Sequence, residues 1–426
     1  MSILIEGAIL KGEPHSLWLE GGRIRAIRAG TDPDWGESAG TPDRVLDGRG
    51  LHAFPSLRNS HTHVAMVLFR GYGDDMPLMK WLETRIWPAE GRLTAEDVYD
   101  GARLGILEMI RSGTSFFNEM YWHRPALVRA VEDMGVRAML GVNLIDLGDP
   151  ATLEAQKDEI RELVPGGEGT GRARLALAPH SVYTVGPKEL EWVGELAREH
   201  DVRIHIHLSE TAGEVERCVE EHGCRPAEHL RRLGLVGPHL IAAHGQYLDE
   251  AELALLAEGG ATVVTNPLAN LKLATGGIFP YAAARRAGLR VCLGTDGASS
   301  NNNLDLFEEI KMVALLQKHR EADATVLPAD EALGLATTVP ARLFGQGSGE
   351  VAEGEPADLV LVDLSGPATQ PVHDPVSALV YAANGSCVRT TICDGQVLMH
   401  EGVVEVCDED EVVARAVEVA RRVTAE

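Results

Sequence analysis

Two histidines that lie two residues apart, His61 and His63, end a short apolar run of the sequence. In a β-strand, residues i and i+2 point to the same face, so the two imidazoles would be aimed at one point. Imidazole is a ligand for zinc, iron, copper and nickel. An isolated His-x-His motif is more often a pair of surface histidines in a loop. The motif therefore predicts a metal site only if further ligands occur at matching positions of the chain.

The elements that would supply such ligands recur between Leu51 and about residue 349, where eight short apolar runs alternate with stretches of helical periodicity. Their spacing averages roughly 30 residues, the size of a βα unit. This pattern predicts an α/β fold, a (β/α)₈ barrel of the TIM type, with its functional residues at the carboxyl ends of the strands. The strands are expected at Leu51–Asn59, Ser115–Met120, Arg137–Leu144, Arg174–Ala178, Arg203–Leu208, Leu240–Ala243, Ala261–Thr265 and Arg290–Leu293.

Both ends of the chain are rich in short strands instead. Gly21-Gly22 separates two of them near the N-terminus, and Asp394-Gly395 separates two near the C-terminus, which are hairpin signals. Asp32–Asp43 is rich in Gly, Pro and Asp and is expected to be a loop. We therefore expect the two ends to pair into one small β-sandwich. The predicted division is a composite β-domain of residues 1–54 and 350–426, and a catalytic barrel of residues 55–349.

A polar side chain stands at the end of every expected barrel strand, and histidine or aspartate stands at the majority of them. Packing alone does not explain this concentration, because barrel interiors are filled mainly by branched apolar residues. In strand order, the end residues are His61 and His63, Asn118 and Glu119, Asn143 and Asp146, His180, His207 and Glu210, His244, Asn266, and Asp296.

Four of these residues, His61, His63, His207 and Asp296, would form a shell of three nitrogens and one oxygen. Such a shell leaves a position for water, which is typical of a catalytic metal site, and the metal would make hydroxide available at neutral pH. Glu210, three residues after His207, would lie above the metal in a position for proton transfer. No lysine that could bridge a second metal follows the fourth strand, so the sequence favours a single metal ion.

Three further residues each have more than one possible role. His205 shares a strand face with His207, and packing inside the barrel is its favoured interpretation. His244 would either hold the hydroxide or stabilise charge on the attacked centre. Trp81 is equally compatible with core packing and with a helical lid that stacks on a flat ring. In the second case Glu90, at the end of the same segment, would accept a hydrogen bond from a sugar hydroxyl.

The composition excludes several other classes of protein. The net charge is −25, from 64 acidic and 39 basic residues, and the acidic residues are scattered. This charge argues against nucleic acid or an anionic membrane as a partner. We expect no signal peptide and no membrane span, because no apolar run reaches about 18 residues. The six scattered cysteines indicate reduced thiols. A cytoplasmic protein is therefore expected.

Taken together, the motifs resemble those of the amidohydrolase superfamily. Within it, they are similar to the methylthioadenosine/S-adenosylhomocysteine deaminases and the closely related 5′-deoxyadenosine deaminases. The likeness covers nearly the whole chain, and its motifs are highly specific. The matching stretches include Asn59-Ser60-His61-Thr62-His63, Trp81-Leu82-Glu83, Ala178-Pro179-His180, His205-Ile206-His207-Leu208-Ser209-Glu210, Asn266-Pro267, Leu293-Gly294-Thr295-Asp296-Gly297 and Ser300-Asn301-Asn302.

The resemblance implies hydrolytic loss of ammonia from C6 of an adenine nucleoside. It implies one divalent metal per subunit, Zn²⁺ or Fe²⁺, and a homo-oligomer, a dimer or tetramer. It also assigns roles by position: His61, His63, His207 and Asp296 to the metal; Glu90 and His180 to the ribose; Trp81 and Ser300 to the substrate pocket; Glu210 to protonation of the purine ring; His244 to the attacking hydroxide; and Asp296 to transfer of its proton to the leaving amine.

Two departures from the family pattern concern specificity. Relatives that accept the amino-acid tail of S-adenosylhomocysteine carry arginines on and after the third strand, whereas Met139–Pro150 contains none. We therefore expect neutral 5′-substituents, with 5′-deoxyadenosine first, methylthioadenosine next, adenosine as well, and S-adenosylhomocysteine last. Gly245-Gln246-Tyr247 replaces the more usual Cys-Val-His after His244 and is expected to reshape the pocket.

Two alternatives stay open on the sequence. One is another activity of the superfamily, such as a guanine or cytosine deaminase or a chlorotriazine hydrolase, which would share the metal chemistry. Glu90 and His180 speak against it, since a free base or a triazine has no ribose for them to contact. The other is a non-catalytic scaffold on this fold, which would be expected to lack metal ligands, whereas all four are present here.

Overall fold

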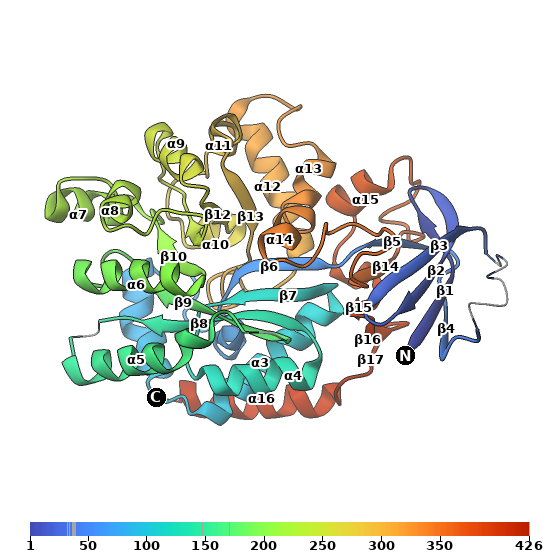
Figure 1. Cartoon of the computed structure of the whole chain (residues 1–426), viewed down its shortest axis with the longest axis horizontal. Helices are drawn as coiled ribbons and strands as arrows, with labels where there is room; N and C mark the ends of the chain where they lie inside the picture. The colour runs from blue at the N-terminus through green and yellow to red at the C-terminus, as the bar shows by residue number, and fades with distance from the viewer. Residues whose placement is uncertain (32, 34, 36–39, 147, 170, 426) are drawn as a thin grey trace.

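Two β-sheets organise the chain: a barrel of eight strands and a second sheet built from both ends of the sequence (Figure 1). The structure is a computed structural model of the 426-residue chain. It describes residues 1–31, 33, 35, 40–146, 148–169 and 171–425. Parts of the loop expected at Asp32–Asp43 lie outside the described residues. Among the described residues, no helix is long and apolar enough to span a membrane.

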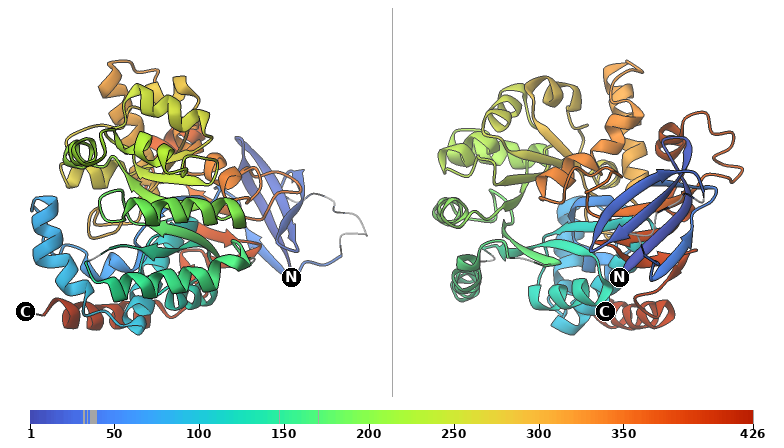
Figure 2. Two further views of the ribbon diagram at one scale, coloured as in Figure 1. Left: turned by 60° about the vertical axis from the view of Figure 1, so that its left-hand side comes forward. Right: turned by 45° about the vertical axis from the view of Figure 1, so that its right-hand side comes forward.

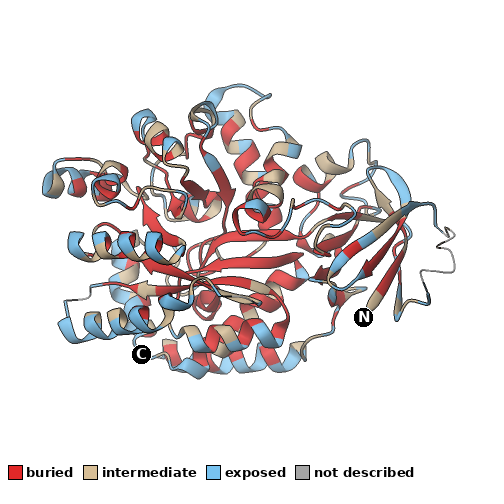
Figure 3. Cartoon of the chain, viewed as in Figure 1, coloured by how far each residue is buried: buried red, intermediate tan, exposed pale blue. Residues whose placement is uncertain are grey.

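The barrel sheet follows the order of the chain from β6 to β13, and its neighbouring strands are parallel. The strands are buried along almost their whole length, as Figure 3 shows. Helices cover their outer side and side chains fill the interior. The predicted (β/α)₈ barrel is thus confirmed. Its strands are β6 (Leu57–Thr62), β7 (Thr114–Glu119), β8 (Arg137–Leu144), β9 (Ala173–Pro179), β10 (Ile204–Leu208), β11 (Leu240–His244), β12 (Thr262–Thr265) and β13 (Arg290–Leu293).

The helices of the barrel begin where the sequence contains capping residues. Thr94 caps the helix after the first barrel strand through a capping box with Asp97, and Asp249 forms another with Glu252. The helices are α3 (Ala95–Arg111), α4 (Arg124–Met134), α5 (Pro150–Leu163), α6 (Pro187–His200), α7 (Ala212–His222), α8 (Pro226–Arg232), α9 (Glu250–Glu258), α10 (Pro267–Lys272), α11 (Tyr281–Ala287), α12 (Leu306–Glu321), α13 (Ala329–Gly334) and α14 (Thr338–Leu343).

The second sheet joins strands from the two ends of the chain, as expected. Both predicted hairpins are present, with Glu20 paired to Arg23 and Cys393 paired to Gln396 across two-residue turns. The strand order is β17-β16-β15-β14-β5-β1-β2-β3, with β4 on β1. The strands are β1 (Ser2–Leu10), β2 (Glu13–Glu20), β3 (Arg23–Ala29), β4 (Arg44–Asp47), β5 (Leu51–Pro55), β14 (Leu359–Asp363), β15 (Val388–Cys393), β16 (Gln396–His400) and β17 (Val403–Val404).

The expected first barrel strand, Leu51–Asn59, was wrong as a single element. Its first half is β5, which pairs antiparallel with β14 in the terminal sheet, and its second half begins β6 in the barrel. The chain crosses between the sheets at Ser56, whose hydroxyl lies 2.6 Å from that of Ser115. Only Ser56 separates the two strands, so periodicity does not reveal that they belong to different sheets.

The C-terminal helix α16 (Glu409–Thr424) lies along α3 of the barrel and not on the terminal sheet (Figures 1 and 2). Ion pairs join the two helices, with Arg111 Nη1 2.7 Å from Glu409 Oε2 and Arg103 Nη2 2.9 Å from Glu411 Oε2. A boundary at residue 350 thus assigns to the β-domain a helix that packs on the barrel. The division into 1–54 with 350–426 and 55–349 remains a proposal.

A buried ion network connects the terminal sheet to the barrel. Arg58 on β6 and Asp358, just before β14, are each 1% exposed, and Arg58 Nη2 lies 3.3 Å from Asp358 Oδ2. Arg58 also donates to Gln346 Oε1 and to the main-chain oxygen of Ser56, both at 2.9 Å. Arg137 on β8 contacts the same aspartate. Burial lowers the pKa of Arg58 to about 9, so its charge depends on these partners.

Replacing Arg58 with methionine is expected to lower the free energy of unfolding by about 3 kcal/mol, because removal of one partner leaves the rest of a buried ion network uncompensated. Urea unfolding followed by circular dichroism measures this change. The matched control is Arg286→Met, since Arg286 is 67% exposed and its ion pair with Glu250 is 3.7 Å long. An exposed pair contributes about 1 kcal/mol at most. Equal unfolding midpoints for both variants would contradict the role given to Arg58.

Candidate functional site

A cavity of about 490 Å³ lies at the carboxyl ends of the barrel strands. Parallel strands of a barrel end at one rim, so side chains far apart in sequence meet there. His61 is not among the lining residues and lies beneath the cavity, fully buried. All other residues predicted for the site line the cavity: His63, Trp81, Glu90, His180, His207, Glu210, His244, Asp296 and Ser300.

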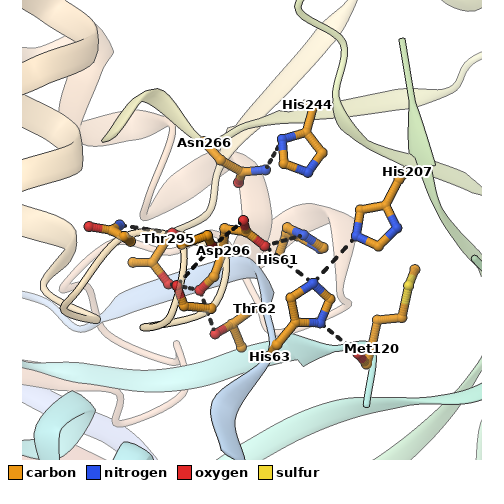
Figure 4. Close-up of polar contacts among 12 residues, drawn as sticks. His61, Thr62, His63, Met120, His207, His244, Asn266, Thr295 and Asp296 are labelled. Carbon is orange, nitrogen blue, oxygen red and sulfur yellow. Dashed lines mark hydrogen bonds and ion pairs between the residues drawn. The ribbon is translucent and has the colours of Figure 1, made fainter. Parts of the chain in front are cut away.

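The four residues expected to bind a metal converge on one point (Figure 4). Asp296 Oδ1 lies 3.2 Å from Nε2 of both His61 and His63. His207 Nε2 lies 3.4 Å from His63 Nε2. His61 and His63 come from β6, His207 from β10, and Asp296 from the turn that follows β13. Nitrogen and oxygen atoms this close together fit the donor set of a divalent metal such as zinc.

The proton positions on these histidines support the same conclusion. His63 Nδ1 lies 2.6 Å from the main-chain oxygen of Met120, and His207 Nδ1 lies 2.9 Å from that of His180. A carbonyl oxygen only accepts, so both Nδ1 atoms carry a proton, and in the neutral rings both Nε2 atoms present lone pairs. Two such lone pairs 3.4 Å apart repel each other unless a proton or a metal cation lies between them. The geometry of the two rings therefore suits a shared cation.

The electrostatics of the cluster also favour a cation. Burial lowers the pKa of His61 to about 3, which keeps the ring neutral and able to act as a ligand. Burial also acts to lower the pKa of His63, but the hydrogen bond and charge of Asp296 outweigh it and raise that pKa to about 9. Burial opposes ionisation of Asp296, yet its hydrogen bonds with His61 and His63 hold its pKa well below the usual range. The Asp296 carboxylate therefore favours a positive charge at this point, either a proton on His63 or a metal cation in its place.

The backbone is strained where it presents two of these groups. Asp296 has φ +61° and His244 has φ +71°, both in the left-handed region that residues other than glycine rarely adopt. Gly294, two residues before Asp296, allows the end of β13 to approach β6. A Cβ at this position would lie 2.7 Å from the main-chain oxygen of His61. The fold thus places Asp296 against His61 at a cost in backbone energy, as is common at functional sites.

Glu210 and His244 face each other beside the cluster. His244 Nε2 lies 4.0 Å from Glu210 Oε2, and His244 Nδ1 lies 3.0 Å from Asn270 Oδ1. Burial raises the pKa of Glu210, so the carboxyl group retains its proton more readily than an exposed glutamate. The loop of Glu210 is fixed by Glu214, which accepts from the main-chain nitrogens of Ser209 and Glu210 at 2.7 and 2.8 Å. This arrangement suits proton transfer.

Glu90 and His180 lie in the same cavity, and each has a fixed orientation. Tyr121 donates to Glu90 Oε1 at 2.8 Å, and burial raises the pKa of Glu90. His180 Nδ1 lies 2.9 Å from Thr184 Oγ1, and burial lowers the pKa of His180 to about 4. The carboxyl group of Glu90 is largely buried and has one oxygen free of hydrogen bonds to this chain's described side chains, so it is suited to accept from a hydroxyl of a ligand.

Trp81 belongs to a helical segment, Leu78–Glu90, that covers the cavity and consists of α1 (Leu78–Trp81), η3 (Leu82–Ile86) and α2 (Trp87–Glu90). The middle turn is a π-helix, which is frequent at functional sites. Trp81 is 5% exposed and its Nε1 donates to the main-chain oxygen of Tyr72 at 3.2 Å. It is therefore both packed and part of the cavity wall.

Ser300 lines the cavity, but its hydroxyl is already used. Ser300 Oγ donates to Asp296 Oδ2 at 2.5 Å, so its direct effect is on the orientation of Asp296. The departure Gly245-Gln246-Tyr247 does not line the cavity. Instead, Gln246 Nε2 donates to Thr275 Oγ1 at 3.0 Å, and Tyr247 Oη donates to the main-chain oxygen of Thr275 at 2.5 Å. These two side chains hold the segment that follows Leu273, a lining residue.

Sequence reasoning missed several residues of the cavity wall. Met120, Tyr121 and Trp122 come directly after β7, so the rule that strand ends carry function could have found them. Ile145 likewise follows β8 directly, but its side chain is apolar and carries no chemical signal. Thr152 and Gln156 on α5 and Tyr183 in a loop lie away from the strand ends, where the rule does not apply.

Comparison with known proteins agrees with the geometry. The model of the amidohydrolase family matches residues 53–398. The chain is 50% identical over 385 residues to a 5′-deoxyadenosine deaminase of Methanoregula boonei, which covers 90% of this chain and 87% of the relative. It is 41% identical over 423 residues to 5-methylthioadenosine/S-adenosylhomocysteine deaminase 1 of Archaeoglobus fulgidus, with 99% and 97% covered.

Among solved structures, an adenosine deaminase from Xanthomonas campestris with bound zinc superimposes with a TM-score of 0.93. The two share 37% sequence identity, and the superposition covers 99% of this chain and 98% of the other. The family model spans most of the barrel and reaches the terminal sheet at both ends. The chain belongs to the amidohydrolase family.

Proposed function

We propose that this protein is a metal-dependent hydrolytic deaminase of adenine nucleosides whose 5′ position is neutral. The products are the corresponding inosine analogue and ammonia. The preferred substrate is 5′-deoxyadenosine, followed by methylthioadenosine and adenosine, with S-adenosylhomocysteine last. The observation that carries this proposal is a cavity that joins the His61–His63–His207–Asp296 cluster to a largely buried carboxyl group, Glu90. Relatives named for these substrates support it.

The four clustered residues would hold one divalent metal per subunit, zinc or iron. When bound, that metal would supply a nucleophilic hydroxide at neutral pH. Asp296 would accept the proton released as the nucleophile attacks C6 and pass it to the leaving amine. Glu210, whose pKa is raised by burial, would protonate the purine ring. His244 Nε2, 4.0 Å from Glu210, would stabilise the charge that develops at C6.

Glu90 and His180 would recognise the ribose. The free oxygen of Glu90 would accept from a sugar hydroxyl, while Tyr121 holds the other oxygen at 2.8 Å. A free base or a chlorotriazine lacks the sugar and would leave this buried carboxyl group without its partner. This is the reason to prefer a nucleoside over the other substrates of the family.

The remaining wall of the cavity carries no positive charge. None of the described lining residues is an arginine or a lysine. Gln156 is committed to Ile145, because its Oε1 accepts from the main-chain nitrogen at 2.8 Å and its Nε2 donates to the main-chain oxygen at 3.2 Å. A carboxylate on the 5′ side would be desolvated without a cation, which is costly. A neutral 5′ group avoids this cost.

The test is a side-by-side turnover assay on 5′-deoxyadenosine, methylthioadenosine, adenosine and S-adenosylhomocysteine. Ammonia release and the change from adenine to hypoxanthine absorbance are both followed. We expect 5′-deoxyadenosine to lead and S-adenosylhomocysteine to trail in kcat/KM. If S-adenosylhomocysteine leads, the proposed order is wrong. If no nucleoside is turned over with metal present, the free-base and triazine activities replace the proposal. Metal analysis and size-exclusion chromatography of the same sample test the proposed zinc or iron and the proposed homo-oligomer.

Specificity can be tested separately at Ile145, which follows β8 and lines the cavity. Ile145→Arg is expected to raise the ratio of kcat/KM for S-adenosylhomocysteine over 5′-deoxyadenosine by about tenfold, since hydrogen bonds to charged groups contribute about 1.5–3 kcal/mol. The control is Ile145→Gln, which adds length and polarity without charge. A ratio that is unchanged in Ile145→Arg, or equally raised in both variants, would show that charge at this wall does not select the 5′ group.

A further inference from the structure

We propose that His205 is a positioning residue for the metal ligand His61. The Nε2 atom of His205 accepts a hydrogen bond from the N–H at Nδ1 of His61. This hydrogen bond keeps the Nε2 lone pair of His61 directed at the metal. The inference rests on the metal site in the proposed function and assigns a role to a histidine that sequence reasoning took for core packing. His205 does not line the cavity, so it acts only through His61.

The two rings are arranged for a hydrogen bond. His61 Nδ1 lies 2.9 Å from His205 Nε2, and the ring planes are nearly perpendicular, at 87°. Both side chains are fully buried. His205 sits two residues before His207 on β10, so the two rings share a face of the strand and His205 lies one layer deeper in the barrel. Because both rings are fully buried, a contact of this length between ring nitrogens requires one proton between them.

The position of that proton follows from the groups around His205. In the described structure, His205 Nδ1 has no side-chain or main-chain hydrogen bond of normal geometry. The direction of the bond to His61 follows from the proposed metal: a neutral His61 ring that gives its Nε2 lone pair to a metal carries its proton on Nδ1, so His61 donates and His205 accepts. The proton of the neutral His205 ring is then on Nδ1. His205 Nε2 then offers its lone pair to His61.

His205 thereby completes a pattern shared by all three ligand rings. The Nδ1 atoms of His63 and His207 face the carbonyls of Met120 and His180 at 2.6 and 2.9 Å, which fixes their tautomers. His61 Nδ1 faces no carbonyl, and the lone pair of His205 replaces it. Without this acceptor, His61 could carry its proton on Nε2 and donate to Asp296 Oδ1, 3.2 Å away. That tautomer removes one ligand from the metal.

The experiment measures zinc affinity without substrate. Metal-free protein is titrated with Zn²⁺ in competition with a chromogenic chelator. His205→Leu, which removes the acceptor, is expected to weaken zinc binding by about 10- to 100-fold, the usual effect of losing a group that orients a ligand. His205→Gln keeps an acceptor oxygen on a side chain of similar length and is expected to stay within about threefold of the wild type. The matched control is His229→Leu on α8, a histidine that is 6% exposed and lies outside the cavity.

Thermal unfolding of the metal-free variants shows whether a loss of zinc affinity comes from poorer packing of the fold or from a changed orientation of the His61 ring. If His205→Gln and His205→Leu lose affinity equally, or if His205→Leu binds zinc as tightly as the control, His205 only fills space and the inference is wrong. Because no substrate is present, failure of the proposed function gives a different result. A protein that shows the expected zinc series but deaminates no adenine nucleoside keeps the inference and loses the function. A wild-type protein without zinc affinity overturns both.

Discussion

Replacing Glu210 with glutamine is expected to lower kcat for 5′-deoxyadenosine by about 10³-fold, within the range for loss of a general acid. The side chain keeps its size and its hydrogen-bonding oxygen but cannot give a proton to the purine ring. The structure supports this role because Glu210 lies in the cavity wall, 4.0 Å from His244, and burial raises the pKa of its carboxyl group. Metal content is expected to stay at the wild-type level, since Glu210 is not one of the four clustered ligands.

A second buried glutamate supplies the control for this substitution. Glu252 is 3% exposed, pairs with Arg225 at 2.8 Å and closes the capping box of α9, away from the cavity. Glu252→Gln is expected to reduce stability but to leave kcat within about threefold, because it touches no group in the site. Steady-state kinetics and metal analysis on both variants check the prediction. Retention of more than a tenth of the kcat by Glu210→Gln would remove Glu210 from the role of general acid.

The barrel and its cluster could be predicted because two simple regularities meet in this sequence. The alternation of apolar runs and helical stretches gives strands whose carboxyl ends share one rim. The i, i+2 spacing of His61 and His63 puts two rings on one face. Neither rule needs contacts between distant residues. The same reasoning placed Asp296 beside the histidines, and the structure adds its strained φ of +61°, which sequence does not reveal.

The elements that could not be predicted depend on long-range packing. The break at Ser56 is invisible because a single residue separates β5 from β6, although the two strands pair in different sheets. Helix α16 is amphipathic, which predicts a buried face but not that this face meets α3. His205 is the clearest case. The sequence predicts its strand and its face, yet only the 2.9 Å contact between His205 Nε2 and His61 Nδ1 distinguishes a positioning residue from a packed one.

The largest loss of activity is expected for Asp296→Asn, at about 10⁴-fold or more in kcat, the upper range for loss of an acid–base group. Asparagine keeps an oxygen for the cluster but has no charge and cannot carry a proton between the nucleophile and the leaving amine. The backbone should tolerate the change, because asparagine is among the residues that most readily adopt the left-handed region found at Asp296. Thermal unfolding of the variant checks that the fold is kept.

Adding zinc to this variant distinguishes the two roles proposed for Asp296. If the carboxylate served only as a ligand, excess zinc would restore the kcat of Asp296→Asn, just as it should restore wild-type protein stripped by a chelator. If the carboxylate also moves the proton, zinc will bind and kcat will stay low. The second result is expected from the positions of the two carboxylate oxygens. Ser300 donates to Oδ2 at 2.5 Å and so orients the group, while Oδ1 faces the histidines at the reacting centre. Asp305→Asn is the control: it changes a partly buried aspartate that caps α12, where asparagine caps equally well, and kcat should not fall.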